Sequence, residues 1–259
     1  MRKGILSAVT FLTGLFGISS IALAVPTLQL NIEGGTYYDT YLMDDGNGNT
    51  FEVTQSWFTK DNPFTLDVVG ADSPSLITNI TDVNLYISVQ DQFFVPDGKV
   101  TVSGESKTWS FDVADFIHGT PSEFSDGKNF PSHGIYPSNY VVLALGDLLV
   151  DDLSQREAIY DYNQDYNPDN LPATPPAVGD IQRYQIFYEG FYHLHFDLTG
   201  TAYGEKSWAD GKSKFAPFSH DADAPPPQTP VPEPATLLLF GTGLIGLAAI
   251  RKRPGIKKD

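Results

Sequence analysis

Hydrophobic and polar residues alternate with a period of two through much of the chain. The alternation is regular at 28–32, and at 82–90 four aliphatic residues fall on one face. This period is typical of a β-strand with one buried face, so both segments are predicted to be half-buried strands. Helical periodicity is weak, and only 114–117 and 153–160 are expected to form short helical turns.

Clusters of Gly, Asn and Asp divide the remaining pattern into further strands. The turn at 44–49 predicts a hairpin, and Glu189–Gly190 predicts a two-residue hairpin. Segments 116–139 and 160–180 are rich in Pro or Gly and are expected to be long loops. The further strands are predicted at 36–43, 51–58, 64–69, 99–104, 106–113, 140–145 (a buried strand), 183–188 and 191–198.

Many short strands with closely spaced turns indicate an all-β fold, namely an antiparallel β-sandwich. A jelly-roll-like topology fits this spacing best, and immunoglobulin-like and barrel topologies are the alternatives. The pattern places this domain at 25–220, followed by a Pro-rich acidic linker at 221–230.

The N-terminus has the three parts of a secretory signal peptide. Met1-Arg2-Lys3 is basic, the following residues are apolar, and Ala22-Leu23-Ala24 has the small residues that signal peptidase accepts. We therefore predict a signal peptide at 1–24, with Ala22 and Ala24 at the cleavage site. A retained transmembrane anchor is the alternative.

The C-terminus is also tripartite: Pro232-Glu233-Pro234, an uncharged apolar run at 235–250, and the basic cluster Arg251-Lys252-Arg253, with a tail at 254–259. As a helix the apolar run would rise about 24 Å, which is shorter than the ~30 Å hydrocarbon core of a bilayer. Such a segment suits a processed membrane signal, and an ordinary transmembrane helix is the alternative. The basic cluster is expected to remain cytoplasmic.

These C-terminal residues resemble the PEP-CTERM sorting domain of exosortase substrates. The resemblance implies processing by a membrane exosortase, transient association with the inner membrane, and delivery to the cell surface or extracellular matrix of a Gram-negative bacterium that makes exopolysaccharide. Two further segments, 25–30 and 212–222, look similar to the choice-of-anchor N subgroup of these proteins.

Charge and cysteine content exclude several kinds of chemistry. The formal net charge is −16, and seven of the 16 Lys and Arg residues lie in the two terminal signals and the tail at 254–259. Nucleic acid is not an expected partner of so acidic a domain, because phosphate binding needs basic residues. The absence of cysteine excludes disulfides, thiolate metal sites and cysteine nucleophiles.

Three segments carry candidate binding chemistry, and each has a plainer interpretation. Asp44, Asp45, Asn47 and Asn49 offer oxygen ligands for calcium, although a hairpin turn uses the same residue types. Segment 161–170 with Tyr160, Tyr162 and Tyr166 suits a sugar site or a solvated loop. His193 and His195 are expected to face one side of a strand, as metal ligands or as ordinary strand histidines.

No nucleophile motif is present, and so many carboxylates provide acid pairs that identify no glycosidase site. We therefore expect a protein that is not an enzyme and has a structural or interaction role. A carbohydrate-binding module that contacts exopolysaccharide is the alternative, and a secreted glycoside hydrolase is a third reading.

Overall fold

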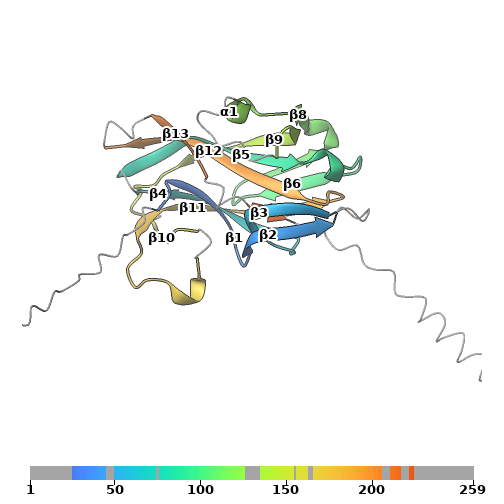
Figure 1. Cartoon of the computed structure of the whole chain (residues 1–259). Helices are drawn as coiled ribbons and strands as arrows, with labels where there is room; N and C mark the ends of the chain where they lie inside the picture. Colours follow the sequence, from blue (N-terminus) through green and yellow to red (C-terminus); the bar gives the residue numbers. More distant parts are fainter. Residues whose placement is uncertain are drawn as a thin grey trace, which may run out of the picture.

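The computed structural model describes residues 25–44, 50–73, 76–125, 135–154, 156–162, 166–205, 211–216 and 222–224. Nearly all regular structure in these ranges is β-strand, arranged in two sheets (Figure 1). The predicted all-β sandwich is confirmed. The helical elements are short, namely α1 (Ser122–Ser125), η1 (Asp91–Phe93), η2 (Val113–Asp115) and η3 (Pro168–Asn170).

The first sheet, called sheet A, is antiparallel throughout. Strand β11 lies at its centre, with β4 on one side and β6 on the other. In order across the sheet, its strands are β1 (Leu28–Ile32), β4 (Phe64–Ala71), β11 (Ala177–Glu189), β6 (Lys99–Ser103) and β7 (Thr108–Asp112), with β10 (Glu157–Ile159) also paired to β11.

The second sheet, sheet B, is antiparallel except where β14 runs parallel to β3. In Figure 1 the β2–β3 hairpin lies beside β1, so sheet B curls toward sheet A at this end. In order, its strands are β2 (Thr36–Asp44), β3 (Thr50–Phe58), β14 (Ala222–Ala224), β12 (Leu194–Gly204), β5 (Ile77–Val89), β9 (Ser138–Leu148) and β8 (Ile117–Gly119), with β13 (Lys212–Phe215) also paired to β12.

Seven of the thirteen connections between successive described strands cross from one sheet to the other, as in a sandwich, and the jelly-roll-like topology stays a prediction. The predicted hairpin at Glu189–Gly190 is therefore wrong, because β11 belongs to sheet A and β12 to sheet B. Gly190 has a φ of +75°, and a Cβ there would lie 3.0 Å from the Cα of Gly98. The glycine is needed for a tight corner between the sheets.

The hydrophobic core lies between the facing sides of the two sheets. On β12 the apolar side chains at alternate positions are fully buried, whereas on β11 the exposed and buried positions alternate from 183 onward. Truncating a fully buried leucine such as Leu66 or Leu85 to alanine is expected to cost about 2–5 kcal/mol of folding free energy.

Strand β1 is buried on both faces, so the prediction of a half-buried strand is wrong. The outer face of sheet A is covered there by the segment that follows β10. Gln29 Nε2 donates to the Tyr160 carbonyl at 3.2 Å, and Tyr162 N donates to Gln29 Oε1 at 3.0 Å. These bonds satisfy the buried amide, which explains how a polar residue is tolerated inside.

Four other segments differ from the sequence-based expectation. The helical turn predicted at 153–160 instead contains strand β10, and the loop predicted at 116–139 contains β8 and α1. The strand at 140–145 is not fully buried, since Val142 is 44% exposed. Strand β14 lies inside the predicted linker at 221–230, so the sandwich extends to Ala224.

Candidate ligand-binding cleft

A cleft of about 570 Å³ lies between the two sheets, where the β6–β7 turn approaches β9 and β11. It combines aromatic rings with amide, hydroxyl, carboxylate and ammonium groups. Polar groups outweigh apolar ones in this lining, so the cleft differs from the mainly apolar pockets that bind most small molecules and suits a hydrophilic ligand. The lining residues are Gly104, Glu105, Ser106, Lys107, Trp109, Ala144, Leu145, Gly146, Asp180, Ile181, Gln182, Arg183 and Tyr184.

Trp109 forms the aromatic wall of the cleft. It lies on β7, the edge strand of sheet A, and is only partly buried. Its ring is tilted by 54° to that of Tyr184, with 6.3 Å between the ring centroids. Lys107 Nζ lies 4.7 Å from the centroid of the indole, within the range of a cation–π interaction.

The floor of the cleft is held in place by a chain of hydrogen bonds. The Tyr184 hydroxyl donates to Gln182 Oε1 at 2.7 Å, and Gln182 Nε2 donates to the Asp147 carbonyl at 3.0 Å. A Cβ on Gly104 would lie 3.0 Å from the Tyr184 ring, so this glycine lets the turn pack against the tyrosine. Burial raises the pKa of Tyr184 to about 12, and the phenol therefore stays protonated and can donate.

Two carboxylates line the cleft. Asp180 lies on β11, is almost fully buried, and accepts a hydrogen bond from Leu149 N at 3.1 Å. Burial raises the pKa of Asp180 above its ordinary value. Glu105 is exposed on the β6–β7 turn. The two acids thus have different environments, one rigid and desolvated and one open to solvent.

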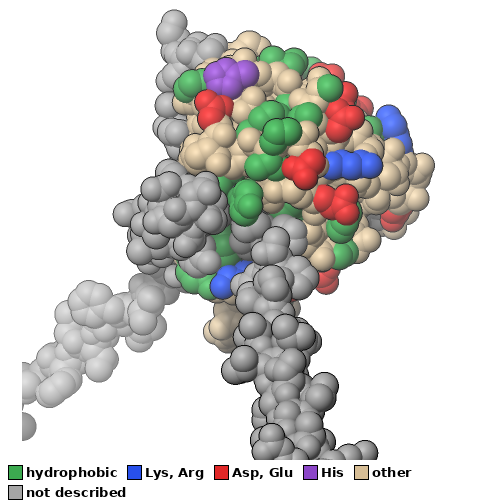
Figure 2. All heavy atoms as spheres, turned by 90° about the vertical axis from the view of Figure 1, so that its right-hand side faces the viewer, with side chains coloured by type: hydrophobic (Ala, Val, Ile, Leu, Met, Phe, Trp, Pro, Cys, Tyr) green, Lys and Arg blue, Asp and Glu red, His purple; other side chains and the backbone are tan. Residues whose placement is uncertain are grey.

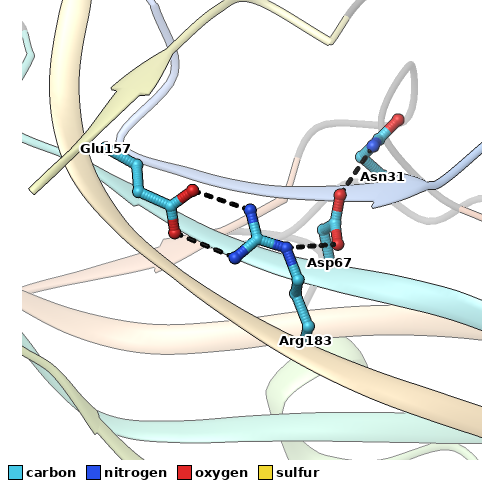
Figure 3. Close-up of polar contacts among 4 residues, drawn as sticks. All are labelled: Asn31, Asp67, Glu157 and Arg183. Atoms are coloured by element: carbon cyan, nitrogen blue, oxygen red, sulfur yellow. Dashed lines mark hydrogen bonds and ion pairs between the residues drawn. The ribbon is translucent and has the colours of Figure 1, made fainter. Parts of the chain in front are cut away.

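A polar network braces the strand that carries the floor (Figure 3). Arg183 donates through Nη1 and Nη2 to the two carboxylate oxygens of Glu157, at 2.9 and 2.7 Å. Its Nε lies 3.9 Å from Asp67 Oδ1, and Asn31 Nδ2 donates to Asp67 Oδ2 at 2.9 Å. These four residues connect β1, β4, β10 and β11 across the outer side of sheet A.

The two central members of this network, Arg183 and Asp67, have shifted pKa values. Hydrogen bonding to Glu157 raises the pKa of Arg183, which keeps the guanidinium charged. Burial raises the pKa of Asp67, although the bond from Asn31 and the charge of Arg183 oppose the shift. The guanidinium is therefore the nearby cation for a carboxylate that is largely withdrawn from water.

A second polar network lies on sheet B, away from the residues that line the cleft, and joins the buried His195 and Asp197 to the partly buried Tyr136. The Tyr136 hydroxyl donates to Asp197 Oδ2 at 2.7 Å, and His195 Nε2 lies 3.2 Å from Asp197 Oδ1. Tyr136 also stacks on Phe124 of α1, with centroids 5.3 Å apart. Since Asp197 is fully buried, we interpret the network as a structural brace that attaches the α1 segment to the sheet.

The two histidines that the sequence pairs have different contacts in the structure. His195 lies on β12, whereas His193 precedes that strand and packs edge-on against Phe93 with 5.6 Å between centroids. Both are buried. Among the residues described by the structure, no group of three or more His, Cys, Asp and Glu side chains could hold a metal ion.

The tyrosine platform expected at 160–166 is also different in the structure. Tyr162 is buried in a small core beneath sheet A, and its carbonyl accepts a bond of 2.7 Å from Trp57 Nε1. Tyr166 packs against it, with 4.7 Å between ring centroids. The expectation that Tyr162 stacks on a sugar is therefore wrong, because its ring contributes to the core.

Other predicted site residues lie outside the described part of the chain. Asp44 ends β2, but its side chain and residues Asp45 to Asn49 are among those not described, so the calcium site stays a prediction. The same holds for the signal cleavage residues Ala22 and Ala24, the sorting motif Pro232-Glu233-Pro234 and the basic cluster Arg251-Lys252-Arg253. No described helix is long and apolar enough to cross a membrane, and segment 235–250 was not among those residues.

Acidic side chains are spread over the surface in Figure 2. On this face they lie among hydrophobic and basic side chains and do not form one continuous acidic patch. The carboxylates on this face therefore do not form a single cation-binding surface. Their excess over basic groups favours solubility.

Comparison with known proteins identifies the C-terminal segment. Residues 230–253 match the family model described as the PEP-CTERM protein-sorting motif. No curated protein matches the chain. A solved structure described as AvmM, which catalyses macrocyclization in alchivemycin A biosynthesis, is 13% identical, covers 75% of this chain and 92% of that chain, and has a TM-score of 0.31. A TM-score this low does not establish a common fold.

Proposed function

We propose that the chain is a non-enzymatic protein with a structural or interaction role at the cell surface or in the exopolysaccharide matrix. Residues 230–253 match the PEP-CTERM protein-sorting motif, so the chain is an exported PEP-CTERM domain-containing protein that is processed by an exosortase. The sorting motif is the observation that carries this proposal. The described residues form a β-sandwich and the chain is acidic, which suits a solvent-filled matrix.

The proposed route has two processing steps. Signal peptidase removes residues 1–24 after Ala24, and the chain is then held briefly in the inner membrane of a Gram-negative cell by 235–250. Exosortase cleavage near Pro232-Glu233-Pro234 follows, and the sandwich passes to the cell surface or the exopolysaccharide matrix. The choice-of-anchor N subgroup remains part of this proposal, on the resemblance of 25–30 and 212–222.

The position of β14 supports this order of events. Only residues 225–229 separate this last strand from the matched motif, so the chain between them can span no more than about 20 Å. The sandwich is therefore held near the cleavage site until the exosortase acts. A short tether of this kind suits a domain that is presented at the surface before it is transferred.

The test measures intact mass and location of the protein from its native host, with and without the exosortase. We expect a mature form that begins at Val25, ends near Pro232 and reaches the surface or matrix only when the exosortase is present. Replacing Pro232, Glu233 and Pro234 together by alanine should block maturation. Pro226→Ala, which lies outside the matched motif, is the control and should mature normally. Retention of the full C-terminus through Asp259 in the membrane, regardless of exosortase, would refute the proposal.

The alternative functions are a carbohydrate-binding module and a secreted glycoside hydrolase. The cleft with Trp109 and Tyr184 favours the first, since aromatic rings beside polar groups suit a sugar. A hydrolase would use the acids Glu105 and Asp180. Incubation of the exported protein with matrix polysaccharide separates the two, because binding leaves the chain length of the polymer unchanged and hydrolysis shortens it.

A further inference from the structure

We propose that the cleft between the β6–β7 turn, β9 and β11 binds a neutral saccharide, with Trp109 as the surface on which one sugar ring packs. This inference deepens the proposed matrix role and rests on it for the source of the saccharide. The binding chemistry is argued from the cleft alone.

The shape of a sugar ring explains the residue types. A pyranose has an apolar C–H face and a rim of hydroxyl groups, so its site needs a flat apolar surface and fixed hydrogen-bonding partners. The partly exposed Trp109 supplies the flat surface, and the exposed Lys107 side chain that lies over the indole moves aside when the sugar packs there. Gln182 and Asp180 supply the partners, and both are already held in place by bonds to the backbone of Asp147 and Leu149. Pre-positioned partners lower the entropy lost on binding.

The charges in the cleft favour a neutral ligand. Two carboxylates, Glu105 and Asp180, line it together with the ammonium group of Lys107. Arg183 also lines it, but its guanidinium is committed to Glu157. Recognition of a phosphate or a uronate needs clustered cations. The two cations of this cleft do not cluster, because Lys107 lies over Trp109 and Arg183 is bonded to Glu157. An anionic polymer is also repelled by a chain of net charge −16.

The β9 wall is poorly suited to an extended peptide. A peptide that adds to a sheet edge needs a regular row of backbone N–H and C=O groups. The register of β9 against β5 is interrupted around Val83 and Gly146, and Gly146 has a φ of +100°. A bulge at this point breaks the regular edge. A Cβ added at Gly146 would meet nothing within 4 Å, so the exposed backbone there borders open space.

The first test is binding of the exported protein to a panel of neutral hexasaccharides (cellohexaose, maltohexaose and mannohexaose), to neutral polysaccharide from the host matrix, and to an alginate hexamer as the anionic probe. Isothermal titration gives the dissociation constants. We expect at least one neutral probe to bind and alginate not to bind. Trp109→Ala and Gln182→Ala should each weaken binding about tenfold or more, equivalent to about 1.4 kcal/mol. Phe187→Ala is the matched control, because Phe187 is an exposed aromatic on β11 outside the cleft.

Oxidative footprinting of the unaltered protein keeps the test independent of how well the variants fold. We expect a bound saccharide to protect Trp109 and to leave Phe187 unchanged. The inference is overturned if no neutral probe binds, if binding is unchanged in both cleft variants, or if a peptide and not a saccharide protects Trp109. These outcomes differ from failure of the proposed function, which is read from mass and location. A protein that reaches the matrix but binds no neutral saccharide keeps its proposed role and loses this site.

Discussion

Removing the charge of Arg183 tests whether the network in Figure 3 supports the strand beneath the cleft. We choose Arg183→Met because methionine keeps an unbranched apolar stem and removes the guanidinium. Glu157→Gln removes only the charge of the more exposed partner. Asp67→Asn removes the buried charge and keeps an acceptor for Asn31. Gln185→Met, at a neighbouring exposed position on β11, controls for the loss of a polar side chain.

The expected magnitudes follow from exposure. The Arg183 and Glu157 side chains are 51% and 41% exposed, so their ion pair should contribute only about 0.5 kcal/mol. Asp67 is 10% exposed and would lose its nearby cation. Breaking a fully buried pair costs about 3–5 kcal/mol, and with a half-exposed arginine 3.9 Å away we expect about 2 kcal/mol for Arg183→Met. The double variant Asp67→Asn/Arg183→Met should recover most of that loss.

Urea denaturation at neutral pH, at low and high ionic strength, gives the four unfolding free energies of the cycle. We expect Arg183→Met to be much less stable than Glu157→Gln, and the coupling to Asp67 to be about 1.5–2 kcal/mol. If Arg183→Met costs no more than Glu157→Gln, Asp67 does not depend on the arginine. If the loss persists in the Asp67→Asn background, it comes from packing of the stem, and the electrostatic reasoning is refuted.

Two further predictions concern the same strand. Gly179→Ala should destabilise the fold by about 3 kcal/mol or more, since its Cβ would overlap the carbonyl oxygen of Gly70. Gly70→Ala should cost less, because its Cβ meets only side-chain methyl groups at 3.0–3.2 Å. Thermal unfolding compares the two variants, and equal losses would contradict this reasoning. Asp180→Asn should stabilise the protein at neutral pH, because burial raises the pKa of Asp180 in the folded state and its ionised form is therefore destabilising above that pKa. This gain should vanish as the pH falls through the folded pKa toward 3.8, and a gain that does not change with pH would rule out titration of Asp180 as its cause.

Local pattern predicts the strands well and their partners poorly. The alternation at 28–32 and 82–90 locates β1 and the second half of β5, because successive side chains of a strand point to opposite faces whichever strand lies beside it. Glu189–Gly190 marks a real change of direction, but its residues carry no information on whether the chain returns to the same sheet. The burial of Gln29 also escapes prediction, since it depends on a segment more than a hundred residues away.

The cleft is less predictable than the fold. Its lining comes from three separate parts of the chain, around 104–109, 144–146 and 180–184, and no motif connects them. The only local signal is a tryptophan that follows a Gly-Glu turn, a combination found in many ordinary hairpins. The C-terminal signal differs from the cleft, because its three parts are adjacent in the sequence and form a linear motif. It could therefore be recognised without any structure.

The place of β14 in sheet B has a consequence for how the protein matures. Among the described strands, β3 is bonded to β2 on one side and to β14 on the other, so the β2–β3 hairpin joins the rest of its sheet through the last strand of the domain. The paired residues Trp57 and Ala222 are far apart in sequence, and closing so long a loop is slow. A chain that crosses the membrane with its N-terminus first releases this hairpin early and β14 late. The sandwich is thus completed only when its C-terminal end has emerged, close to the point where the sorting enzyme cuts.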